Sequence, residues 1–252
     1  MTSMVDSPVL VFVVSLATMW FSVHVGALFR GKRPLDEEER HDFDIILAAT
    51  LTLLGLIIGF SFSMVVSRYD QRKNYEEGEA NAIGTEYVRA GVLNGTDATT
   101  VRELLKSYVD QRVLFYETRD GSELARIDAQ TARLQTELWS VVQAAAAKQP
   151  TPTIALVVSG MNDVLNSQGY TQAAWWNRFP IPAWGLLMVI AIFCSVLLGY
   201  GSRRNETVLF LILPLAVSIS FFLIADIGSP REGFIRVVPQ NLLSLCQSWQ
   251  PQ

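Results

Sequence analysis

The stretch Ile45–Val66 reads IILAATLTLLGLIIGFSFSMVV and contains no Asp, Glu, Lys or Arg. A helix of this length, at about 1.5 Å rise per residue, crosses the ~30 Å hydrocarbon core of a bilayer. The charged run that follows, from Arg68 to about Val92, has no strong helix breaker. We therefore expect one long helix that crosses the membrane and continues out of it, joining a membrane-spanning part to a polar part.

Three further segments also lack formal charge: Pro8–Phe29, Phe179–Gly201 and Val208–Ala225. Charged residues make up only 17% of the 252, and the mean hydropathy is +0.27. Outside the four segments the charge density is that of ordinary soluble protein. The spans and the net charge of −4 exclude a purely soluble enzyme, a disulfide-stapled secreted domain and a nucleic-acid binder. A polytopic membrane protein is left, and we interpret the first segment as a retained anchor.

The chain divides into four parts: spans 1 and 2 at 8–66, a helical extramembrane domain at 67–178, spans 3 and 4 at 179–225, and an amphipathic tail at 226–252. The domain shows helical periodicity throughout and no strand alternation, so the fold class is all-α. We expect a capping box at Thr100-Val-Arg-Glu103 and a last helix over about residues 153–169. In the tail, the apolar spacing after Pro239 predicts a short helix, lying at the membrane interface or docked on the domain.

Four crossings place the N-terminus, the helical domain and the tail on one side of the membrane. The short loops on the other side carry six basic residues, namely Arg30, Lys32, Arg33, Arg40, Arg203 and Arg204, whereas residues 1–7 carry none. The span ends on the domain side also carry six basic residues, but the asymmetry around the first span usually decides orientation. We therefore expect insertion in the cell (inner) membrane with the helical domain on the extracytoplasmic side.

Small residues repeat every fourth position on three spans, which places each set on one helix face. The sets are Thr18, Ser22 and Gly26; Gly55, Gly59 and Ser63; and Ala191, Ser195 and Gly199. Such faces let helices pack closely in lipid, and packing within one bundle explains all three. In the alternative, span 2 lines a central pore in a homo-oligomer, with Gly55, Gly59 and Ser63 as lining and Phe60 and Phe62 as apolar constrictions.

The charged continuation of span 2 offers candidates for a pore mouth: Arg68, Arg72, Glu76, Glu79 and Glu86. A ring of such helices would present rings of charge to passing ions, where carboxylates favour cations and basic groups favour anions. The alternative is a solvated helix carrying weak surface ion pairs. The small residues around Ala80 and Gly84 are unusual for a solvated surface and indicate that another helix packs there.

His24 is the only histidine inside a span, and Cys194 is the only cysteine inside one. His24 faces the bundle or a water-filled path, or it is a neutral imidazole hydrogen-bonded to a neighbouring helix. The absence of Asp, Glu and Lys from the spans argues against a proton-coupled transporter. With two Cys and two His in all, we expect no metal site, no cofactor and no enzymatic activity.

The runs Arg68-Tyr-Asp-Gln-Arg72 and Glu79-Ala-Asn-Ala-Ile-Gly-Thr-Glu-Tyr-Val-Arg89 resemble a mostly bacterial family of bestrophin-like membrane proteins of unknown function. The resemblance extends over Thr50–Val66, Met161–Leu165 and Gly199-Tyr200. It implies a two-plus-two span layout around a helical domain and, through true bestrophins, an oligomeric anion channel lined by span 2. True bestrophins keep that domain in the cytosol and carry an acidic calcium-binding cluster after the last span, where this chain has Asp226 nearly alone.

We therefore predict an all-α protein with four transmembrane helices and a long helical domain between spans 2 and 3. The expected function is a homo-oligomeric ion channel or channel-like protein, with the lipid bilayer, further copies of the chain and inorganic ions as partners. The alternative is a non-conducting scaffold or sensor whose helical domain binds a partner.

Overall fold

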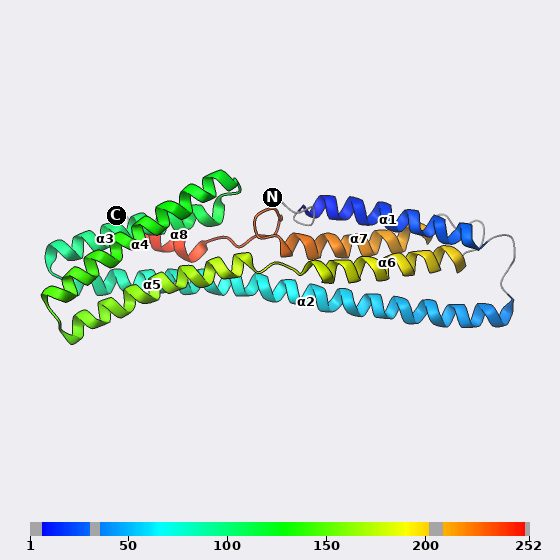
Figure 1. Cartoon of the computed structure of the whole chain (residues 1–252), viewed down its shortest axis with the longest axis horizontal. Coiled ribbons are helices and arrows are strands. Elements are labelled where there is room, and N and C mark those ends of the chain that lie inside the picture. Colours follow the sequence, from blue (N-terminus) through cyan, green and yellow to red (C-terminus); the bar gives the residue numbers. More distant parts are fainter. Residues whose placement is uncertain (1–6, 31–35, 202–208, 250–252) are drawn as a thin grey trace. The chain divides into compact units, whose positions relative to one another are not determined.

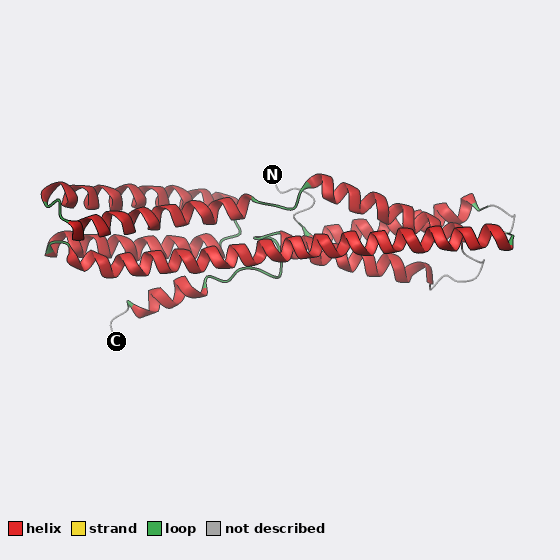
Figure 2. Cartoon of the chain, turned by 90° about the horizontal axis from the view of Figure 1, so that it is seen from below, coloured by secondary structure: helices red, strands yellow, loops and turns green. Residues whose placement is uncertain are grey.

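The computed structural model describes residues 7–30, 36–201 and 209–249, and within these ranges it contains helices and no strand (Figure 2). The all-α prediction is confirmed. The helices along the chain are α1 (Pro8–Phe29), α2 (Glu37–Arg89), the 3₁₀ turn η2 (Ala90–Val92), α3 (Gly95–Glu117), α4 (Gly121–Lys148), α5 (Pro152–Trp176), α6 (Ile181–Gly201), α7 (Leu209–Gly228) and α8 (Gln240–Ser248) (Figure 1). The basic residues Lys32, Arg33, Arg203 and Arg204, on which the expected orientation draws, lie outside the described residues.

The chain forms two compact units, Met1–Tyr69 with Arg178–Arg236 and Asp70–Asn177 with Val237–Gln252. We call them the membrane unit and the helical domain. Helix α2 contributes to both, because its 53 residues continue from the apolar span to Arg89 without interruption. The predicted long helix is thus confirmed. It begins earlier than the apolar span, where Asp36 accepts the backbone N–H of Glu39 and Glu39 accepts that of Asp36, a reciprocal cap.

The membrane unit holds the described helices that are long and apolar enough to cross a bilayer. Helix α1 packs on α6 and α7, and the side chains of α2, α6 and α7 meet in an apolar cluster around Leu187, Cys194 and Phe221. Backbones of α1 and α6 touch at two glycines. A Cβ on Gly26 would lie 2.0 Å from the Val196 carbonyl oxygen, and one on Gly199 would lie 1.9 Å from the Val23 carbonyl oxygen. The small-residue faces of spans 1 and 3 therefore pack on each other, which agrees with the interpretation that such faces serve packing within one bundle.

The helical domain packs α3 against α4 and α4 against α5, with the domain part of α2 alongside. Two sequence expectations are wrong here. Helix α3 begins at Gly95, so Thr100 lies inside it and donates its hydroxyl to the Thr96 carbonyl instead of capping. Helix α5 continues to Trp176, well beyond residue 169, because Thr171 and Trp175 are still buried within the domain.

Of the two places considered for the tail helix, the structure shows the docked one. Helix α8 packs on α3 within the helical domain, with Leu242 fully buried and Trp249 stacked on Tyr87 at 4.1 Å between ring centroids. A Cβ on Gly84 would lie 3.2 Å from the side chain of Leu245. The prediction that a helix packs on the small residues of α2 is confirmed, and that helix is α8.

Candidate pore face and the buried charges of the helical domain

In the membrane unit, one side of α2 is buried and the other is bare. Leu54, Ser61 and Val65 face the core of the unit. No atom of the described residues lies within 4 Å of the position that a Cβ on Gly55 or Gly59 would take, and Ser63 is exposed. Packing within one bundle therefore does not explain the small-residue stripe of span 2, although it explains those of spans 1 and 3.

The two phenylalanines flank this bare stripe on opposite sides. Phe60 is 65% exposed and Phe62 is 40% exposed. At about 100° per residue, Gly55, Gly59 and Ser63 fall within about 80° of one another on the helix, whereas Phe60 and Phe62 are about 160° apart. A pore axis that Ser63 faces therefore cannot be constricted by Phe60 and Phe62 to the same extent.

The candidates for a pore mouth lie elsewhere than the sequence analysis expected. Arg72, Glu76, Glu79 and Glu86 are all buried inside the helical domain, at 2% exposure or less, and Arg68 is half-buried. The interpretation of this stretch as a solvated helix with surface ion pairs is therefore wrong for these four side chains. Burying charged groups is costly unless each one is paired or neutralised, so their partners explain how the domain is held together.

Glu79 joins α2 to two other helices of the domain. Its carboxylate accepts from Nε of Arg112 on α3 at 2.5 Å, from the hydroxyl of Thr171 on α5 at 3.1 Å, and from the phenol of Tyr116 at 3.5 Å. Burial lowers the pKa of Arg112, but the Glu79 carboxylate together with Tyr108 and Tyr116 outweighs this, so the pKa is raised overall. Burial and the same carboxylate raise the pKa of Tyr116. Arg112 is thus charged and Tyr116 neutral at any physiological pH.

Glu76 caps the N-terminus of α8 from a different helix. Its Oε1 accepts the backbone N–H groups of Asn241 and Leu242, both at 3.0 Å, and its Oε2 accepts from the Asn241 side chain at 2.6 Å. The residue at the N-cap position of α8 is Pro239, whose side chain has no oxygen to offer. A carboxylate at this end also interacts favourably with the helix dipole. The docking of α8 therefore has a polar anchor as well as an apolar one.

Glu86 is the exception among the buried charges. Its side chain is fully buried, and within the described part of the chain neither carboxylate oxygen has a hydrogen-bond partner. It lies against Gly160 of α5, where a Cβ would be 2.1 Å from Glu86 Oε2. Burial raises the pKa of Glu86 from 4.5 to about 8, with Arg89 opposing the shift and Asp163 adding to it. This carboxyl is therefore mostly protonated at neutral pH.

The outward face of α2 in the helical domain carries side chains that the sequence analysis overlooked. Asp70, Asn74, Glu77 and Asn81 are exposed. Their spacing from Ser63 is 7, 11, 14 and 18 residues, close to whole numbers of helical turns, so they continue the side of the helix on which Ser63 lies. Their helical spacing from Ser63 is the sequence signal that indicates this face, although the buried side of the same helix carries more charged residues.

His24 lies on the exposed side of α1, and its hydrogen bond is formed within α1 instead of with a neighbouring helix. That it faces a water-filled path stays a prediction. Its Nδ1 is 2.8 Å from the carbonyl oxygen of Trp20, one turn earlier on the same helix, and the two rings are 4.3 Å apart. Because a carbonyl only accepts, Nδ1 carries a proton and donates it. The imidazole is therefore satisfied within its own helix and does not face the bundle.

Asp226, at the end of α7, stabilises the segment that follows this helix. Its two carboxylate oxygens accept the backbone N–H groups of Phe234 at 2.6 Å and Ile235 at 2.9 Å, which folds the segment after α7 back on the helix end. Among the described residues, no group of three or more His, Cys, Asp or Glu side chains is placed to hold a metal ion.

These features define a multi-span membrane protein whose second span extends into a helical domain and leaves a bare, small-residue face. Residues 9–242 match the Bestrophin-like domain family, and the chain belongs to that family. No functionally curated protein matches the sequence.

Solved structures show the same fold. A crystal structure of a bacterial bestrophin homolog from Klebsiella pneumoniae, a point mutant, superposes with a TM-score of 0.62 and 12% identity, covering 95% of this chain and 99% of that one. Another mutant of that homolog gives 0.64 and 11%, covering 94% and 97%. A crystal structure described only as a membrane protein gives 0.64 and 12%, covering 93% and 98%. At these identities the likeness concerns the fold.

Proposed function

We propose that the protein is a homo-oligomeric ion channel in which the bare face of α2 lines the pore. The observation that carries the proposal is that no helix in the described part of the membrane unit packs on Gly55, Gly59 and Ser63, whereas the equivalent faces of α1 and α6 pack on each other. Small side chains and one hydroxyl suit a water-filled path. Membership of the bestrophin-like family supports the same assignment, because true bestrophins are oligomeric channels lined by this span.

The outward side chains of α2 in the helical domain form the mouth of the path in this proposal. Asp70 and Glu77 are exposed carboxylates on that side, whereas the basic Arg72 is buried. Rings of carboxylates favour cations over anions. Glu77→Lys is therefore expected to shift the reversal potential toward anion permeation, while the same charge change at the exposed Glu123 of α4 should leave it unchanged.

A thiol-block experiment tests the pore. The purified protein is reconstituted in liposomes and its ion flux is measured for Ser63→Cys and for Val189→Cys, in a background without Cys194 and Cys246. Val189 is an exposed residue of α6, on a different helix from the proposed pore face. A charged thiol reagent should block flux through the Ser63 variant only. Monomeric protein that passes no ions would instead favour the scaffold or sensor alternative.

The orientation of the domain completes the proposal. The charge distribution favours an extracytoplasmic domain, whereas kinship with true bestrophins favours the cytoplasm. Because the tail helix belongs to the helical domain, a reporter fused to the C-terminus reads out the side of the domain. Alkaline phosphatase activity from such a fusion would support the extracytoplasmic placement, and green fluorescent protein fluorescence would refute it.

A further inference from the structure

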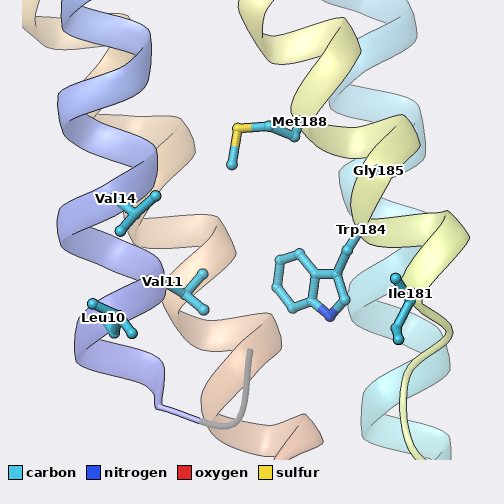
Figure 3. Close-up of a pocket in the computed structure, with 7 residues that line it drawn as sticks. All are labelled: Leu10, Val11, Val14, Ile181, Trp184, Gly185 and Met188. Carbon is cyan, nitrogen blue, oxygen red and sulfur yellow. The ribbon is translucent and has the colours of Figure 1, made fainter. Parts of the chain in front are cut away.

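Helices α1 and α6 touch at one end and separate at the other. Backbone contact at Gly26 and Gly199 fixes the end where both helices finish. Toward the end where both begin, a cavity of about 280 Å³ opens between them (Figure 3). Leu10, Val11 and Val14 line it from α1, and Trp184, Gly185 and Met188 line it from α6.

The walls of this cavity are apolar and preformed. Among the described residues that line it, the indole of Trp184 is the only polar side-chain group, and so apolar a space does not favour ordered water. The indole is fixed edge-on by Phe179 at 5.3 Å and by Phe221 at 5.9 Å between ring centroids. A Cβ on Gly185 would meet no atom within 4 Å, so the missing side chain is part of what leaves the space open.

The N-terminal ends of α1 and α6 indicate how deep in the membrane the cavity lies. Its lining extends over about 6 Å of α1, from Leu10 to Val14, and over about 10 Å of α6, from Ile181 to Met188, so it lies within the first two turns of each helix. Leu10, Val14 and Ile181 are exposed within apolar spans. In a bilayer crossed by these spans, a space at this height opens sideways to lipid, near the membrane surface at which both helices begin.

We propose that this cavity binds the upper part of a phospholipid acyl chain, held between α1 and α6. Hydrocarbon is what surrounds an exposed apolar groove at this depth, and filling it restores the dispersion contacts that an empty space forgoes. A second copy of the chain is the competing occupant. Since α2 does not line the cavity and subunits are proposed to meet through α2, the groove faces lipid; this step alone rests on the proposed function.

Lipid retention tests the proposal without any measurement of ion flux. The protein, purified in mild detergent from phosphatidylethanolamine-rich membranes, is analysed by native mass spectrometry for phospholipids retained per subunit. Gly185→Leu fills the cavity and should retain one phospholipid fewer. Leu186→Phe adds bulk on the exposed neighbouring face of α6, outside the cavity, and should retain the wild-type number. Equal retention by wild type and Gly185→Leu would overturn the proposal.

Fluorescence gives a second, independent readout at the site itself. Phospholipids brominated near the headgroup end of the acyl chain should quench the emission of Trp184, taken as the difference between wild type and Trp184→Phe, and Gly185→Leu should relieve that quenching. Emission of Trp184 that is insensitive to the brominated lipid would refute the assignment. So would a Gly185→Leu protein that loses its oligomeric state, because the occupant would then be a second copy. A channel that fails to conduct but keeps its lipid would count only against the proposed function.

Discussion

Glu86→Gln is predicted to remove a pH dependence of stability from the helical domain. The carboxyl has a pKa of about 8 in the folded protein against 4.5 as its ordinary value. The folded state therefore holds a proton between these pH values that the unfolded state has lost. Stability from this group is complete below pH 4.5 and is lost as the pH rises through 8, which is the sign expected for a raised carboxyl pKa.

The size of the effect follows from about 1.4 kcal/mol for each unit of pKa shift. Between pH 5 and pH 8 the wild type should lose up to about 3.5 kcal/mol from Glu86 alone. For a chain of this size that corresponds to a fall in Tm of roughly 7 °C or more. Other groups titrate over the same range, so the slope attributable to Glu86 is the difference between wild type and Glu86→Gln.

The assay is thermal unfolding of the purified protein in detergent at several pH values between 5 and 8. We expect Glu86→Gln to be nearly flat where the wild type falls, whatever its absolute Tm, since a buried amide without a partner has a cost that does not vary with pH. Glu77→Gln is the matched control, because Glu77 is an exposed carboxyl on the same helix, and it should keep the wild-type slope. Parallel curves for Glu86→Gln and wild type would refute the reasoning.

The remaining predictions concern contacts within each unit. Gly199→Ala should lower Tm by several degrees, since a backbone carbonyl lies in the space of the new Cβ, whereas Gly185→Ala should change it little. Arg112→Met should destabilise the domain by about 3–5 kcal/mol by leaving Glu79 buried without its cation, and adding Glu79→Gln should recover part of this loss in the same melting assay. Glu76→Gln should weaken the cap of α8 by about 1 kcal/mol and so increase the rate of proteolysis in the tail about fivefold; an unchanged rate would show that the apolar contacts alone hold α8.

Much of the fold was predictable because the signals are local. The absence of charge over each span and the lack of a breaker after Val66 are properties of neighbouring residues, and they predict the membrane crossings and the long helix α2 correctly. The small residues at Gly26 and Gly199 likewise indicate close packing. Their mutual contact was not predictable, since it depends on which two helices meet and at what height.

The burial of the charged run was not predictable from local signals. Glu79 finds Arg112 at 33 positions further along the chain and Thr171 at 92 positions. The residues near Glu79 in the sequence do not indicate these partners. The charge pattern of this stretch is, by itself, equally compatible with a solvated helix. Gly55 and Gly26 belong to sets of small residues with the same four-residue spacing. Among the described helices, however, only Gly26 has a neighbouring helix packed on it. Identical local patterns thus acquire different roles through tertiary packing.

In the proposed channel, the two sides of α2 lead to different expectations for mutants with impaired conduction. Arg72, Glu76 and Glu79 are the most conspicuous charges near the proposed path, but each is buried in the helical domain. Their loss would disturb folding or assembly and reduce flux without changing which ion is carried. Selectivity should instead follow the exposed Asp70 and Glu77, whose replacement leaves no buried partner unpaired. A change in reversal potential with normal protein yield is therefore the signature that separates a residue facing the path from one that builds the domain.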